Sequence, residues 1–155
     1  MKTSKATFVQ NNLKEDTGFL LLQLSHLWDN YHERVLKKHY RFSSVQYAVL
    51  ASVHWCVMYS DKEVTQSYLA HHTKINPMTI SQVLGALEKK GYISRKPHST
   101  DTRANAVTVT PKGEELLKDA ILLIAKADAK FFNILGEKNA KIFNKFMVEL
   151  IEEND

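Results

Sequence analysis

The segment from Asn76 to Gly91 most restricts how this chain can fold, because it specifies one amphipathic helix with both ends marked. Asn is a strong N-cap residue, and the proline that follows it fits the first helical turn, where its missing N–H would have no partner. Glycine at the far end favours the left-handed conformation that stops a helix. Apolar residues recur between these ends at helical spacing, as one stripe: Ile80, Val83, Leu84 and Leu87. We therefore expect this helix to bury one face in a core.

The opposite face of the same helix is slim and polar at its start and basic at its end. Such a face can enter the major groove of DNA, which is about 12 Å wide, and touch base edges with its first two turns. Gln82 can bond adenine, and Met78 or the methyl group of Thr79 can touch a thymine methyl. Ser81 and the first backbone N–H groups can reach phosphates. The alternatives are an edge of the core for Met78, plain helix-forming positions for Thr79 and Ser81, and solvated surface for Gln82.

The rest of the chain is predicted to be mainly α-helical, with one small β-hairpin. Thr17, Ser43 or Ser44, Thr65 and Thr110 each precede a helical pattern and are expected N-caps. Alternating residues on either side of a polar turn predict the hairpin. The expected helices cover residues 17–40, 45–58, 66–73, 77–90, 111–135 and from 137 towards the C-terminus, and the expected strands cover 92–96 and 106–109.

Length and composition fit one ordinary globular domain. The chain has 155 residues, of which 44% are hydrophobic and 25% charged, and its single cysteine rules out an internal disulfide. No apolar run approaches the ~20 residues that cross a bilayer, and the first 12 residues lack the apolar segment of a signal peptide, so we expect a cytoplasmic protein without membrane contact. Residues 62–113 hold eight Lys or Arg against three Asp or Glu, a net charge of +5, whereas the whole chain carries +4. The basic charge therefore coincides with the candidate DNA-binding helix.

Five segments occur in an order and spacing that resemble the winged helix-turn-helix of the MarR family of bacterial transcriptional regulators. The most specific of them is Asp101-Thr102-Arg103, followed by a strand and then Thr110-Pro111-Lys112-Gly113. The full set is 64–70, 76–82, 87–93, 101–103 and 107–113. The resemblance implies a winged helix-turn-helix at 61–113, flanked by dimerisation helices at 17–60 and 111–155, all within one domain.

The resemblance also implies roles for individual side chains. Arg103 is expected at or near the minor groove, with Asp101 holding the arginines of the wing in place; a surface ion pair between these two residues is the alternative. Many family members carry Arg where Gln82 stands, so we expect a preference for A·T at that contact. Thr102 stands where a second Arg is common, and Lys74 stands near the position of a usual turn Gly. The complete candidate list for DNA binding is Thr65, Met78, Thr79, Ser81, Gln82, Lys89, Arg95, Lys96, Asp101 and Arg103.

A homodimer on a pseudo-palindromic operator, acting as a repressor, is the expected assembly. Its interface is expected to use the apolar stripes of the first, fifth and last helices, foremost Phe143, Phe146, Met147, Leu150 and Ile151; packing within one chain is the alternative. Family members often release DNA when a small aromatic or phenolic ligand binds between the outer helices and the winged unit. Aromatic or histidine side chains stand in suitable helices, although such residues are more often core: Trp28, Tyr31, Tyr47, His54 and Trp55. The effector cannot be named from the sequence.

Other classes of function find little support in the sequence. No nucleophile elbow, phosphate-binding glycine loop or metalloprotease helix is present, so we expect neither an enzyme nor a cofactor. The seven histidines lack an i, i+4 pair, so no metal site is assigned, although histidines from different helices could converge in a metal-responsive regulator. Ser25 occupies the context where some relatives carry an oxidant-sensing Cys, and Cys56 is expected to be a buried, inert thiol. A winged-helix module that binds protein instead of DNA is the remaining alternative.

Overall fold

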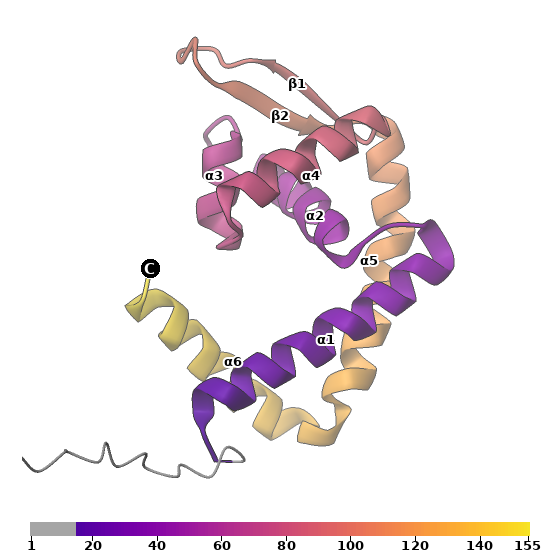
Figure 1. Cartoon of the computed structure of the whole chain (residues 1–155), viewed down its shortest axis with the longest axis vertical. Helices are drawn as coiled ribbons and strands as arrows, with labels where there is room; N and C mark the ends of the chain where they lie inside the picture. The colour runs from indigo at the N-terminus through magenta and orange to yellow at the C-terminus, as the bar shows by residue number, and fades with distance from the viewer. Residues whose placement is uncertain (1–14) are drawn as a thin grey trace, which may run out of the picture.

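The computed structural model describes residues 15–155, which form six α-helices, a short 3-10 turn and one two-stranded antiparallel hairpin (Figure 1). The mainly helical fold with a small hairpin confirms the predicted fold class. The first 14 residues, on which the expectation of a start without a signal peptide falls, lie outside the described part. The elements are α1 Thr17–Tyr40, α2 Ser44–Tyr59, α3 Gln66–Thr73, α4 Pro77–Lys89, β1 Ile93–Pro97, β2 Asn105–Val109, α5 Pro111–Phe132, η1 Asn133–Leu135 and α6 Gly136–Glu153.

Four of the expected helix starts are capped as predicted. Ser43 forms a capping box with Gln46, and the side chains of Thr65, Asn76 and Thr110 each accept a backbone N–H of the first turn. The prediction that Thr17 caps α1 was wrong, because Asp16 does so, accepting the N–H of Phe19 at 2.7 Å. A carboxylate serves this position well, since it is also attracted to the positive end of the helix dipole.

The hydrophobic core lies where α2, α3, α4, the hairpin and the start of α5 meet. Helix α2 supplies Val49, Leu50, Val53 and Cys56, all fully buried, and Phe42 packs beside them. The core thus contains residues from both sides of position 60, where we expected the boundary between the outer helices and the winged unit. The core does not reach the last turns of α2: Trp55, Val57, Met58 and Tyr59 are exposed there, although the sequence of this helix is apolar nearly all the way round.

The turn between α3 and α4 keeps a left-handed residue although no glycine is present. Lys74 ends α3 with φ 57°, a conformation that costs a residue with a side chain roughly 1–2 kcal/mol. Its Nζ also pairs with the Asp155 carboxylate at the C-terminal end. Lys74, which stands near the position of a usual turn glycine, therefore keeps the left-handed turn and adds a contact between the helix-turn-helix and the end of the chain.

The start of α5 is packed tightly against the start of the hairpin. The hydroxyl of Thr110 donates to the Gly91 carbonyl at 2.6 Å and accepts the N–H of Gly113 at 3.2 Å. A Cβ at Gly113 would lie 2.2 Å from the Tyr92 carbonyl oxygen, so only glycine fits. The Thr-x-x-Gly motif therefore joins α5 rigidly to the end of α4 and to β1.

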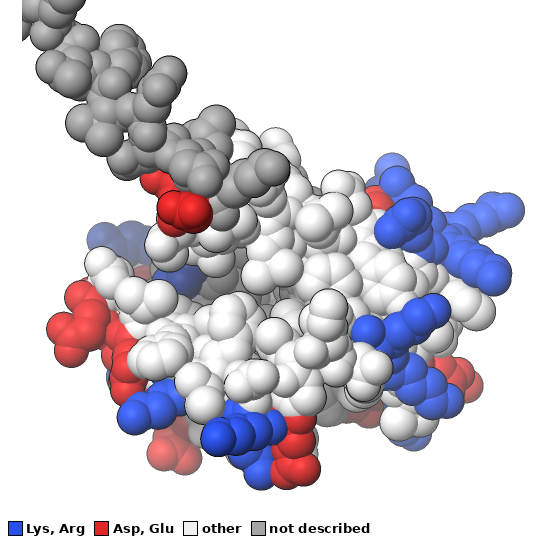
Figure 2. Space-filling view, turned by 90° about the horizontal axis from the view of Figure 1, so that it is seen from below, with Lys and Arg blue, Asp and Glu red and all other residues white. Residues whose placement is uncertain are grey.

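Helices α1, α5 and α6 form an open framework at the other end of the molecule, and α5 runs from this framework to the hairpin (Figure 1). Eighteen large hydrophobic side chains are exposed in the described chain, and twelve of them lie on these three helices. Helix α6 buries none of its residues. Figure 2, seen from the framework side, shows a broad uncharged area with charged groups around its edges. No helix in residues 15–155 is long and apolar enough to span a membrane.

Candidate nucleic-acid interface

Helix α4 has the two faces expected from the sequence. Ile80, Leu84 and Leu87 are fully buried and Val83 is nearly so, while Ser81, Gln82 and Lys89 are exposed. Met78 is 70% exposed, which excludes its alternative placement at the edge of the core. Thr79 is half-buried beside these side chains. The structure therefore brings Met78, Ser81, Gln82 and Lys89 together on the surface of one helix.

Gly85 lies on the same face as Met78, Gln82 and Lys89, at helical spacing. A Cβ built on Gly85 would meet no atom within 4 Å. The packing of the protein itself does not require a glycine here, and the missing side chain leaves a shallow position midway along the exposed face. A large partner such as a nucleic-acid backbone can approach the helix closely at this point.

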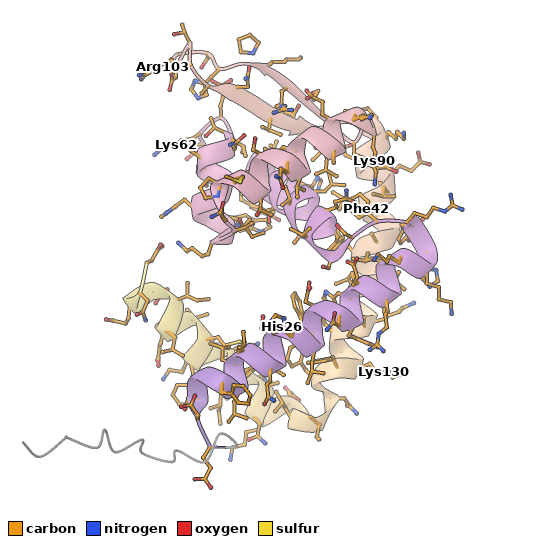
Figure 3. The ribbon with its side chains drawn as sticks, in the orientation of Figure 1. His26, Phe42, Lys62, Lys90, Arg103 and Lys130 are labelled. Carbon is orange, nitrogen blue, oxygen red and sulfur yellow. The ribbon has the colours of Figure 1, made fainter. Side chains whose placement is uncertain are left out.

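The wing places Arg103 at the free end of the hairpin, as Figure 3 shows. Its side chain is 92% exposed. The Asp101 carboxylate accepts the backbone N–H of Arg103 at 3.0 Å and lies 3.6 Å from its Nε. Asp101 thus shapes the turn and touches the guanidinium only loosely, which leaves most of the Arg103 donors available to a partner.

Arg95 does not point freely outward, although it is in the candidate list. Its Nε and Nη2 donate to one Glu88 oxygen at 3.0 and 2.6 Å, and this hydrogen bonding lowers the pKa of the Glu88 carboxyl. The pair ties β1 to the end of α4. Lys96, the next residue, is exposed at the edge of the hairpin.

Thr65 is held where α3 begins. Its Oγ1 accepts the N–H of Tyr68 at 3.2 Å, and its backbone forms an isolated β-bridge with Ala106. A small surface hollow of about 280 Å³ lies beside it and is also lined by Arg95 and Arg103. The structure therefore gathers three candidates from separate parts of the sequence around one basic hollow.

Two acidic side chains outside the candidate list hold the wing. Glu88 binds Arg95, and Glu63, in the link between α2 and α3, accepts the N–H and the hydroxyl of Ser99 in the wing turn. These hydrogen bonds lower the pKa of the Glu63 carboxyl. Opposite charges on either side of the α4–β1 turn could have suggested the Glu88 contact, but 36 residues separate Glu63 from Ser99.

A second cavity, of about 750 Å³, lies between the framework and the winged unit. Of the aromatic or histidine residues proposed for an effector site, Trp28 and Tyr47 line it, whereas Tyr31, His54 and Trp55 do not. Asp128 accepts hydrogen bonds from the Trp28 indole at 2.9 Å and contacts His32 Nε2 at 2.7 Å. Burial, with a smaller contribution from the Asp128 charge, raises the pKa of Tyr47.

The remaining candidates for redox or metal chemistry are Cys56, Ser25 and the metal-ligating side chains. Cys56 is fully buried, and burial raises the pKa of its thiol, as expected for an inert cysteine. Ser25 lines the second cavity. Among residues 15–155, no three His, Cys, Asp or Glu side chains are grouped so that they could hold a metal ion.

Comparison with known proteins identifies relatives of this arrangement. Residues 32–120 match the family model described as transcriptional regulator SarA/Rot. The chain is 32% identical over 115 residues to YdcH of Bacillus subtilis, described as an uncharacterized HTH-type transcriptional regulator, covering 74% of this chain and 77% of YdcH. These relatives are described as regulators and not as enzymes, which confirms that expectation.

Solved structures give the same fold. A complex of S. aureus MepR with DNA is 18% identical and has a TM-score of 0.76, covering 89% of this chain and 98% of that one. A variant of MarR from E. coli in complex with operator DNA is 17% identical and has a TM-score of 0.76, covering 90% and 98%. At these identities the likeness concerns the fold.

Proposed function

This chain belongs to the MarR-like winged-helix transcriptional regulators described as SarA/Rot, and from this premise we propose that it represses transcription by binding an operator as a homodimer. The observation that carries the proposal is the joint position of α4 and the wing. An exposed helix face with small and polar side chains, and a hairpin ending in an exposed arginine, lie on one basic unit. Both structural neighbours named above are DNA complexes.

We assign the contacts as follows. Met78, Thr79 and Gln82 read base edges, with Gln82 favouring adenine, and Ser81, Lys89 and Thr65 contact phosphates. Arg103 enters the minor groove, where a narrow groove concentrates negative potential, and Asp101 positions it. Lys96 adds charge at the edge of the hairpin, whereas Arg95 contributes through its contact with Glu88 and its place beside the basic hollow.

Dimerisation is assigned to α1, α5 and α6. A second copy would cover their exposed apolar side chains, which include Phe146 at 56%, Leu150 at 62% and Ile151 at 56% exposure. Phe143 and Met147 line an apolar groove of about 490 Å³ between these helices. A two-fold dimer would present two α4 helices to half-sites about 34–36 Å apart.

An effector is assigned to the cavity of about 750 Å³, with a change in its expected chemistry. The described residues that line this cavity include the carboxylates Asp29 and Asp128 but neither Lys nor Arg. Aromatic walls beside carboxylates favour a neutral or cationic aromatic molecule over an aromatic carboxylate.

Two probe ions test this assignment: the tetraphenylphosphonium cation and the tetraphenylborate anion match in shape and differ in charge. We expect the cation alone to quench Trp28 fluorescence, measured in a Trp55→Phe background, and Asp128→Asn to weaken this binding. Preferential binding of the anion would contradict the assignment.

Selection of bound duplexes from a random pool tests the main proposal. We expect a pseudo-palindromic site with A·T at the Gln82 position and an affinity that falls steeply with salt, because phosphate contacts release counterions. Occupying a promoter that contains this site should reduce transcription in vitro. Absence of duplex binding at low salt would instead favour the protein-interaction alternative.

A further inference from the structure

Glu63 makes several contacts to the wing turn from outside the hairpin. Its Oε2 accepts the backbone N–H of Ser99 at 2.9 Å, accepts the Ser99 hydroxyl and lies 3.5 Å from His98 Nε2. Glu63 lies in the link that leads into α3, next to Lys62, which Figure 3 labels below the hairpin tip. The carboxylate therefore connects the helix-turn-helix to the turn that carries Arg103.

His98 organises the same turn from within. Its Nδ1 accepts the backbone N–H groups of Thr100 at 3.2 Å and of Asp101 at 3.1 Å. Because a backbone N–H can only donate, the neutral ring carries its proton on Nε2, the atom that faces Glu63. The contacts thus run in sequence from Glu63 through His98 to Asp101, whose carboxylate accepts the backbone N–H of Arg103 and lies 3.6 Å from its Nε.

Each of the three acidic side chains in residues 62–113 contacts the wing. Glu63 binds the turn, Glu88 binds Arg95 of β1, and Asp101 binds Arg103. A carboxylate on this basic unit repels phosphates, so by charge alone its removal should strengthen DNA binding. Any favourable effect of Glu63 on DNA affinity must therefore come from geometry.

We propose that Glu63 is a positioning residue of the DNA interface, which fixes the wing turn through Ser99 and His98 and so sets where Arg103 meets the minor groove. This inference rests on the proposed function, because it assumes that Arg103 contacts DNA. The inference also means that the wing turn is fixed to the link that leads into α3 and does not move independently of it.

The test compares Glu63→Ala, Glu63→Gln and the matched control Asp61→Ala in the full chain, on the selected duplex. Asp61 is an exposed acid two residues away, and Asp61 and Glu63 both line a shallow surface hollow beside Ser99. All three changes raise the net charge by one. We expect Asp61→Ala to leave affinity unchanged or raise it up to about twofold, and Glu63→Ala to lower it about fivefold. Glu63→Gln keeps an acceptor for the Ser99 N–H and should recover part of the loss.

A double-mutant comparison shows whether Glu63 acts through Arg103. Arg103→Ala should weaken binding about tenfold and reduce the slope of log affinity against log salt by about 0.9 for each of the two copies in the dimer. Adding Glu63→Ala to Arg103→Ala should then cause no further loss. If the two losses multiply, or if Glu63→Ala binds as tightly as Asp61→Ala, the inference is wrong while the proposed function stands.

If Arg103→Ala alone leaves both affinity and salt slope unchanged, the assigned role of the wing fails together with the inference. Thermal melting of each variant separates these outcomes from unfolding, since all the altered side chains are exposed and should shift the melting temperature little. If Glu63→Ala does not fold, the comparison of Glu63→Gln with Asp61→Asn decides the question.

Discussion

Replacing Gly85 by alanine should make the protein more stable and its DNA complex weaker. A glycine inside a helix costs roughly 0.5–1 kcal/mol relative to alanine, and the structure shows no atom within 4 Å of the added Cβ that would oppose the gain. For a chain of this length, this gain corresponds to a melting temperature about 1–4 °C higher. The same methyl group would stand on the face that we assign to the major groove.

The loss in DNA affinity follows from packing at a close contact. An extra methyl group in a tightly packed site costs about 1–3 kcal/mol, which is a factor of about five or more in the dissociation constant. Thermal melting by circular dichroism and fluorescence anisotropy with a labelled duplex measure the two quantities. Gly18→Ala is the matched control, because its Cβ would make only an ordinary contact with Asp16 at 3.5 Å, far from α4. A Gly85→Ala protein that melts higher and binds DNA unchanged would refute the close approach of α4.

Three further outcomes are expected. Gly113→Ala should lower the melting temperature by roughly 2–12 °C, because its Cβ would lie 2.2 Å from a backbone oxygen; an unchanged melting curve would contradict the tight junction. Phe146→Asp should raise the dimer dissociation constant roughly 10- to 100-fold in sedimentation equilibrium, because a two-fold interface loses the partly exposed ring twice; a dissociation constant equal to that of the unmodified protein would place the interface elsewhere. The hydrogen bonds from Arg95 lower the pKa of the Glu88 carboxyl from 4.5, so the stability that this pair contributes is present above pH 4.5 and is lost as the pH falls through the lowered value. When thermal melting is followed from pH 5.5 to 3, Glu88→Gln should therefore lose less stability than the unmodified protein. Melting temperatures that fall in parallel for the two proteins would argue against the contact.

The order and type of the elements could be predicted from sequence because local signals agree with the tertiary packing. The cap of Asn76, the stripe from Ile80 to Leu87 and the Thr-x-x-Gly motif each act over a few residues, and all appear in the structure as expected. The cap of α1 differed because Asp16 and Thr17 are adjacent and both can cap, so the pattern alone could not decide between them.

The contacts between distant segments could not be predicted in this way. Helical periodicity shows that α2 is apolar, but it does not show that Trp55 and Tyr59 would reach the surface, because the core ends before the last turns of that helix. The tie of Glu63 to Ser99 and the turning of Arg95 towards Glu88 likewise depend on how the hairpin folds back over the helices. Charge counts and spacing carry no information about that geometry.

The close packing at Gly113 makes α5 a rigid connection between the hairpin and the framework helices. A helix of 22 residues is about 33 Å long, and one end is locked to the hairpin root while the other leads into α6. Tilting such a rod by only ~5° carries its tip sideways by about 3 Å, close to the rise of one base pair along the duplex. In the proposed dimer, a small rearrangement at the interface between the two copies would therefore produce a larger change in the distance between their α4 helices.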